Sequence, residues 1–187
     1  MVFYTYMKLT IRKDRILTKN SKKRDEINMQ YTIFCVGKIK EKYWVDAIKE
    51  YSKRLCRYGK IDFFEVADEK TPDKASDALE EQIKKKEAER LLKGIKDNMY
   101  VVALDIKGKT YDSVELATHL DDLMTQGKSH IAFVIGGSLG LHSSILARAD
   151  EKISFSKMTF PHQLMRVILL EQVYRANRIL KNEPYHK

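Results

Sequence analysis

The feature that most constrains how this chain can fold is a regular alternation of β-rich segments with amphipathic, helix-like segments. The alternation begins directly after Met29 and continues to residue 180. Strands that alternate with helices are typical of a mostly parallel sheet covered by helices on both faces. We therefore predict an α/β fold with a five- to six-stranded sheet. The predicted strands span residues 30–37, 61–66, 99–105, 130–135 and 152–155, and the predicted helices span 42–55, 73–93, 113–125, 143–148 and 161–180.

Residues 1–28 differ from this pattern. From residue 12 to residue 28 the chain is polar and charged, and only three of its side chains are apolar. The segment could be a flexible basic arm, an accessory helix, or sequence upstream of a start at Met29. We favour the third interpretation because the alternating pattern begins right after Met29. The expected organisation is an N-terminal extension over 1–28, outside the natural domain, and one domain over 29–187.

The net charge of +9 suggests a polyanionic partner, usually nucleic acid. Residues 1–28 contain eight Lys or Arg and three Asp or Glu, so they carry +5 and only +4 remains for residues 29–187. Charge alone therefore does not establish that the folded domain binds RNA. No apolar run approaches the ~20 residues that span a bilayer, and the N-terminus lacks a small-residue cleavage site. We expect a cytoplasmic protein without membrane association.

The two cysteines, Cys35 and Cys56, do not make a disulfide framework in a chain of 187 residues. Both lie in segments that resemble core elements, so we expect two buried free thiols in a reducing compartment. The sequence contains no Cys/His cluster with zinc-site spacing, and we expect no metal.

A glycine-rich turn, VIGGSLG at 134–140, directly follows a predicted strand. Glycines at the carboxyl end of a strand let the backbone approach a ligand, and this edge of an open α/β sheet is where ligands bind. The alternative is a tight turn that only requires positive φ. The pattern is not a dinucleotide fingerprint, and GKT at 108–110 is not a phosphate-binding loop because Ala103 stands where that motif needs glycine. Neither NAD nor ATP is supported.

A second candidate ligand segment is SFSKMTFPHQLMRV at 154–167, which runs from a short strand through a loop into a helix. Thr159 precedes Pro161, a residue that suits the start of a helix. Such a loop could offer backbone amides and carbonyls to a base-like ring between apolar side chains. The alternative is ordinary packing.

The last predicted helix carries two pairs of residues spaced four apart, His162 with Arg166 and Glu171 with Arg175. Each pair shares a helix face, and the second pair is expected to form an ion pair. The tail ends in Tyr185, His186 and Lys187, and a terminal segment of this kind is usually frayed. No Ser-His-Asp, Cys-His or paired-carboxylate arrangement is readable, so the sequence gives no support for a hydrolase.

From Met29 to Lys187 the chain resembles the RlmH family of SPOUT-class methyltransferases. The resemblance rests on five stretches whose order and spacing match. They are the first strand ending in VGK at 36–38, LDIKGK at 104–109, VIGGSLGL at 134–141, SFSKMTFPHQLMRV at 154–167 and EQVYRANRILKNEPYHK at 171–187.

The resemblance implies a homodimeric enzyme that uses S-adenosyl-L-methionine to methylate N3 of a pseudouridine in 23S ribosomal RNA, in the large ribosomal subunit or the assembled ribosome. It also implies a C-terminal trefoil knot, a topology too rare to propose from pattern alone. By matching position, it assigns cofactor contacts to Leu104, Gly136, Phe155, Ser156, Lys157, Met158, Thr159 and Phe160. The alternatives are a SPOUT methyltransferase of another RNA and a non-catalytic RNA-binding module.

Methylation at N3 of a uracil-type ring requires that a proton leave the nitrogen, so a general base or a water path is needed. The catalytic candidates are His162, Arg166 and His186, and the sequence does not choose a base among them. The candidates for substrate binding are Arg166, Arg175, Tyr185 and His186. For the two arginines, ion pairing within the helix or across a dimer is the alternative.

The tail follows a helix of ~18 residues that begins beside the predicted cofactor loop. At 1.5 Å per residue this helix is about 27 Å long. The tail therefore cannot easily reach the cofactor site of its own protomer. In a two-fold dimer it could reach the partner's site.

Overall fold

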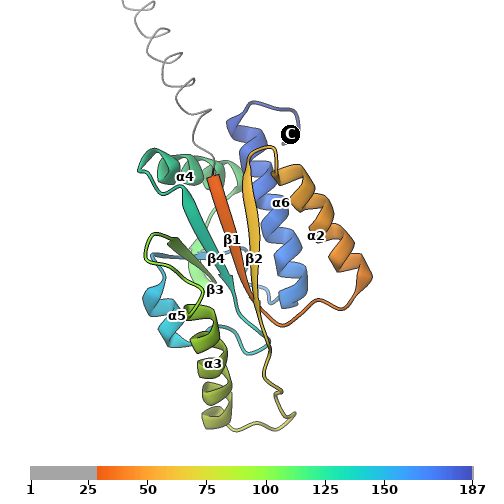
Figure 1. Ribbon diagram of the computed structural model, residues 1–187, viewed down its shortest axis with the longest axis vertical. Helices are drawn as coiled ribbons and strands as arrows, with labels where there is room; N and C mark the ends of the chain where they lie inside the picture. Colours follow the sequence, from red (N-terminus) through yellow and green to blue (C-terminus); the bar gives the residue numbers. More distant parts are fainter. Residues whose placement is uncertain (1–28, 187) are drawn as a thin grey trace, which may run out of the picture.

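The computed structural model describes residues 29–186 (Figure 1). Within this range it contains a five-stranded, entirely parallel sheet in the order β2-β1-β4-β3-β5, which confirms the predicted fold class. The strands are β1 (Met29–Val36), β2 (Gly59–Val66), β3 (Tyr100–Thr110), β4 (His130–Ile135) and β5 (Glu151–Ser154).

Helices cover both faces of the sheet, as predicted (Figure 1). The helices are α2 (Lys42–Leu55), α3 (Asp77–Leu92), α4 (Ser113–Thr125), α5 (Ser143–Arg148) and α6 (His162–Leu180). On one face α6 packs between α2 and α4, and on the other α3 contacts β1, β2 and α5. Because every crossover connects parallel strands, all five strands end at the same edge of the sheet.

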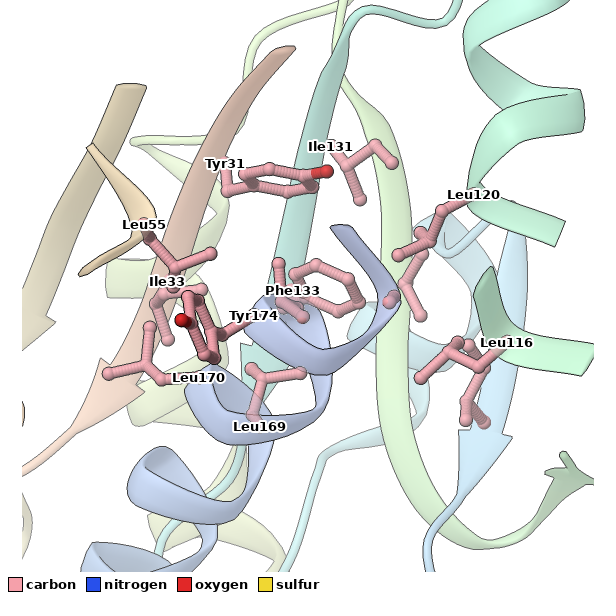
Figure 2. Close-up of a cluster of buried hydrophobic side chains, with 14 of the residues drawn as sticks. Tyr31, Ile33, Leu55, Leu116, Leu120, Ile131, Phe133, Leu169, Leu170 and Tyr174 are labelled. Carbon is pink, nitrogen blue, oxygen red and sulfur yellow. The ribbon is translucent and has the colours of Figure 1, made fainter. Parts of the chain in front are cut away.

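Two hydrophobic clusters hold these layers together, one on each face of β1 and β4. Ile33 and Phe133 face the α2–α4–α6 side, where Leu169 and Leu170 of α6 meet them (Figure 2). Phe34 and Val134 face the α3–α5 side. All six side chains are at most 2% exposed. Burial of each large aliphatic or aromatic side chain stabilises the fold by about 1.5–3 kcal/mol.

Local signals explain where the helices begin. Asp112 caps α4: its side chain accepts from the backbone of Glu115, whose own carboxylate accepts from the Asp112 amide. Helix α3 was predicted from residue 73 but begins at Asp77, because the Ser76 hydroxyl caps it by accepting from the Leu79 amide.

One sequence interpretation at the end of α2 was wrong. Cys56 is exposed, whereas Cys35 is buried as predicted and burial raises the pKa of its thiol to about 12. Leu55 takes the inward position at this helix end and is 0% exposed. Gly59 starts β2, where a Cβ would lie 2.2 Å from the Met29 carbonyl oxygen. Glycine is required at position 59 because the backbone of β1 approaches too closely to leave room for a side chain.

Candidate functional site

A cavity of about 490 Å³ lies at the carboxyl ends of β3, β4 and β5. This is the edge of a parallel sheet where ligands generally bind. Three chain segments form its wall: residues 104–106 of β3, where pairing with β5 is interrupted between Leu104 and Lys109, the glycine turn after β4, and the segment from β5 into α6. The two ligand segments predicted from sequence therefore lie on one cavity.

The glycine turn both lines the cavity and makes a tight turn, the two interpretations that its sequence allowed. Gly136 lines the cavity, but a Cβ on it would lie 2.6 Å from the Gly140 carbonyl carbon. The turn folds back on itself, with the Gly140 amide donating to the Gly137 carbonyl at 3.1 Å and Gly140 at φ 83°. Gly136 is thus needed for the tight turn that forms this wall.

The loop between β5 and α6 forms the opposite wall. Its shape is set locally, because the Ser154 hydroxyl donates to the Ser156 carbonyl at 3.0 Å and the Met158 amide donates to the Ser156 hydroxyl at 2.9 Å. Lys157 is not among the lining residues. The predicted cofactor residues that do line the cavity are Leu104, Gly136, Phe155, Ser156, Met158, Thr159 and Phe160.

Sequence reasoning missed several lining residues, including Asp105, Ile106, Ser138 and Met165. Asp105 and Ile106 follow Leu104 directly, so their place at the carboxyl end of a central strand was the signal available. Ile106 is 60% exposed and Met158 is 70% exposed, so two apolar side chains from different segments of the lining face solvent. Met165 lies within the candidate segment 154–167, but nothing singled out its side chain, because only the docking of α6 brings it to the cavity.

His162, the first residue of α6, lines the cavity. Burial lowers the pKa of its imidazole, and the positive charge of Arg166 lowers it further, while Asp68 and Glu41 act in the opposite direction. The net lowering favours the neutral ring at neutral pH. A neutral imidazole can accept a proton, which suits a general base.

Arg166, one turn further along α6, is only 1% exposed. Its guanidinium donates to the Glu65 carboxylate at 2.6 Å and to the carbonyls of Val36 and Gly37 at 2.7 Å each. These acceptors lie at the carboxyl ends of β2 and β1. Protein groups therefore enclose the guanidinium, and in this protomer Arg166 presents almost no surface to a substrate.

The other predicted substrate residues lie at the far end of α6. The Glu171–Arg175 ion pair forms as predicted, with Nε donating to Oε1 at 3.0 Å. The tail folds back on this pair: the Tyr185 ring packs edge-on against Tyr174 at 4.9 Å between centroids, and its hydroxyl donates to Glu171 at 3.1 Å. His186 is exposed. The tail is thus packed on α6 and not frayed.

Between residues 29 and 186 no group of three or more His, Cys, Asp or Glu side chains is arranged to hold a metal ion. In the same range no helix combines the length and apolar character needed to cross a membrane.

Known proteins similar to this chain were found by sequence and by structure. The model of a family described as predicted SPOUT methyltransferases matches residues 29–186. A ribosomal RNA large subunit methyltransferase H from Clostridium beijerinckii is 61% identical over 159 residues, which cover 85% of this chain and 100% of the relative. A protein of the same description from Bifidobacterium adolescentis is 62% identical with the same coverage. The solved SpoU methyltransferase AviRb of Streptomyces viridochromogenes, in complex with AdoMet, is 13% identical, with a TM-score of 0.44 and coverage of 84% of this chain and 60% of that one.

Proposed function

This chain belongs to the SPOUT methyltransferase family, and from that premise we propose that it is an S-adenosyl-L-methionine-dependent methyltransferase of large-subunit ribosomal RNA. The observation that carries the proposal is the identity of about 60% to ribosomal RNA large subunit methyltransferases H over their whole length. The atom that we propose as acceptor is N3 of a pseudouridine in 23S RNA.

The cavity fits the proposed cofactor. Its volume of about 490 Å³ lies within the range of roughly 300–1,000 Å³ that small-molecule sites occupy. The glycine turn would hold the cofactor through exposed backbone, and Leu104, Phe155 and Phe160 would enclose its apolar parts. When bound, S-adenosyl-L-methionine supplies an activated methyl group, so the protein contributes mainly position and proton handling.

We assign the proton acceptor to His162. It is the titratable side chain of α6 that lines the cavity, and its lowered pKa keeps the ring ready to accept the N3 proton. His186 remains a second candidate, and its exposed position on the tail leaves it free to meet RNA.

The position of the tail supports a homodimer. Arg175, Tyr185 and His186 lie near the carboxyl end of a helix of 19 residues, and a helix of that length measures about 28 Å at 1.5 Å per residue. A second protomer would bring this end of α6 to the partner's cavity. Leu164, Val167 and Ile168 are only partly buried on α6 and offer an apolar contact face.

The proposed substrate also determines where the enzyme is expected to act and which partner it is expected to bind. A ribosomal RNA methyltransferase acts where ribosomes are assembled and used, so we propose a cytoplasmic enzyme whose partner is the large subunit or the complete ribosome. The packed, ordered tail and the well-formed cavity favour an active enzyme over a silent RNA-binding module on the same scaffold.

The test is methyl transfer from tritiated S-adenosyl-L-methionine to ribosomes from cells that lack this enzyme. Free 23S RNA, large subunits and complete ribosomes would be compared, and the modified nucleotide identified by mass spectrometry. Label on one pseudouridine of 23S RNA is the expected result. Label only on another RNA species would replace the substrate, and cofactor binding without any transfer would favour the binding module.

A further inference from the structure

The net charge of the described domain is concentrated at one end of the molecule. Residues 50–58 and 171–186 together contain six Lys or Arg and three Asp or Glu, a net charge of +3. The remaining residues, 29–49 and 59–170, contain twenty of each and are electroneutral. The first two segments lie side by side, because α2 packs along α6 and the C-terminal tail returns beside them (Figure 1). We call this end the arginine–tyrosine surface.

Arginine side chains on this surface lie over tyrosine rings. The guanidinium carbon of Arg54 is 5.5 Å from the centre of the Tyr51 ring, that of Arg57 is 5.6 Å from Tyr58, and that of Arg175 is 4.7 Å from Tyr185. A ring beneath a guanidinium orients it without neutralising its charge. Arg175 is largely engaged by Glu171 and by His186, which lies 3.5 Å from its Nη1. By contrast, Arg54 donates only its Nε to Glu50 and keeps its terminal N–H groups for other acceptors.

The carboxylates of the surface do not balance its cations. Glu50 pairs with Arg54 and Glu171 with Arg175, while Glu183 serves both Arg57 at 3.7 Å and Arg178 at 2.7 Å. Arg54 and Arg57 also remain accessible, with 42% and 64% of their side chains exposed. Oriented, accessible guanidinium groups with surplus charge are the groups that hold phosphates.

We propose that the arginine–tyrosine surface binds the phosphate backbone of the ribosomal RNA next to the methylated nucleotide. The inference rests on the proposed function and adds the part of the molecule that grips the substrate. The surface includes the tail, so in the proposed homodimer RNA held here lies beside the partner's cavity.

The experiment measures binding of large ribosomal subunits and of 23S RNA at several salt concentrations. Arg54→Gln and Arg57→Gln should each weaken binding and lower the slope of log K against log[salt] by about one, the value for a single phosphate contact. The double variant should lower the slope by about two. Glu50→Gln releases Arg54 from its carboxylate and should strengthen binding.

Lys85→Gln is the matched control, because Lys85 is an exposed cation on α3 in the electroneutral part of the domain. It should leave the slope unchanged, and all variants should keep wild-type affinity for S-adenosyl-L-methionine. The inference is overturned if Arg54→Gln and Arg57→Gln retain the wild-type salt slope while the wild type methylates RNA. Binding to phosphatidylglycerol vesicles is measured in parallel, and loss of vesicle binding alone, with RNA binding unchanged, would also overturn it. Absence of methylation by the wild type would instead refute the proposed function.

Discussion

At the scale of single residues, the cavity depends on groups that never touch a ligand. Arg166 joins the first turn of α6 to the carboxyl ends of β1 and β2, and its neighbour His162 lies on the cavity wall. Removing the Arg166 guanidinium would leave the Val36 and Gly37 carbonyls without this donor, and a buried acceptor left without a partner typically costs about 1–3 kcal/mol. Arg166 is therefore a positioning residue.

The charge of Arg166 should be visible in the titration of His162. Arg166→Met removes a positive charge that lowers the His162 pKa, so the pKa should rise and the acid limb of the methyl-transfer rate should move to higher pH. Arg166→Lys keeps the charge and should keep the pKa near that of the wild type. NMR of the imidazole measures the pKa directly, with His162→Gln assigning the signal. An unchanged pKa in a folded Arg166→Met protein would contradict this role.

Gly136→Val should abolish cofactor binding. Its side chain would collide with the backbone of Gly140 and open the turn that forms the cavity wall. Calorimetry with S-adenosyl-L-methionine checks this. Gly127→Ala is the control: it strains a positive φ at a helix end, where a Cβ meets nothing within 4 Å, and should lower stability by about 1 kcal/mol without affecting binding. Normal affinity of Gly136→Val would show that the turn is not part of the site.

At the scale of elements, the two ends of helix α6 belong to two different sites. Its first residues line the cavity, and its last residues with the tail form the arginine–tyrosine surface. The tail is held by α6 itself, since Arg178 donates to the Pro184 carbonyl at 2.9 Å and Tyr185 packs on Tyr174. The Tyr185 ring therefore packs within its own protomer. His186, which is exposed, is then the tail residue that we expect to meet substrate.

Deletion of Tyr185–Lys187 should leave cofactor affinity and oligomeric state intact but reduce methyl transfer by about 10²-fold or more. Mixed dimers sharpen the measurement: one protomer lacks the tail and the other carries Gly136→Val. The intact tail and the intact cavity then lie on opposite chains, and activity should survive. Transfer at the wild-type rate by the truncated enzyme would show that the tail is idle, and deletion of Lys187 alone serves as control.

At the scale of the whole molecule, one protomer offers a complete cavity but places its tail at the other end of the helix. We therefore predict a homodimer at micromolar concentration, which is also the commonest symmetric assembly. Sedimentation velocity measures this. A stable monomer that methylates RNA would refute both the dimer and the tail delivery. The threading of α6 into a trefoil knot stays a prediction from the family.

Residues 1–28 lie outside the described residues and outside the family match, which begins at residue 29. We predict that a protein starting at Met29 keeps its melting temperature and cofactor affinity, because the removed segment has little apolar surface to bury. Differential scanning calorimetry and titration with S-adenosyl-L-methionine compare the two forms. A melting temperature several degrees lower would show that the segment packs on the domain.

The sequence by itself determined the elements and the two segments of the ligand site. Helices α2, α4 and α5 and strand β4 have the predicted bounds, because hydrophobic period and capping residues are local properties of the chain. The glycine turn and the loop before α6 were recognisable because their residue types restrict backbone geometry. The resemblance to a family then named their ligand.

Only the tertiary structure decided what each side chain faces. In the sequence Arg166 was a candidate for catalysis, substrate binding or ion pairing, and burial against β1 and β2 makes it part of the core. Cys56 and Leu55 are neighbours in one helical pattern, yet they face solvent and core respectively. The arginine–tyrosine surface joins segments more than 100 residues apart. Burial and long-range pairing depend on how layers pack, which local sequence does not encode.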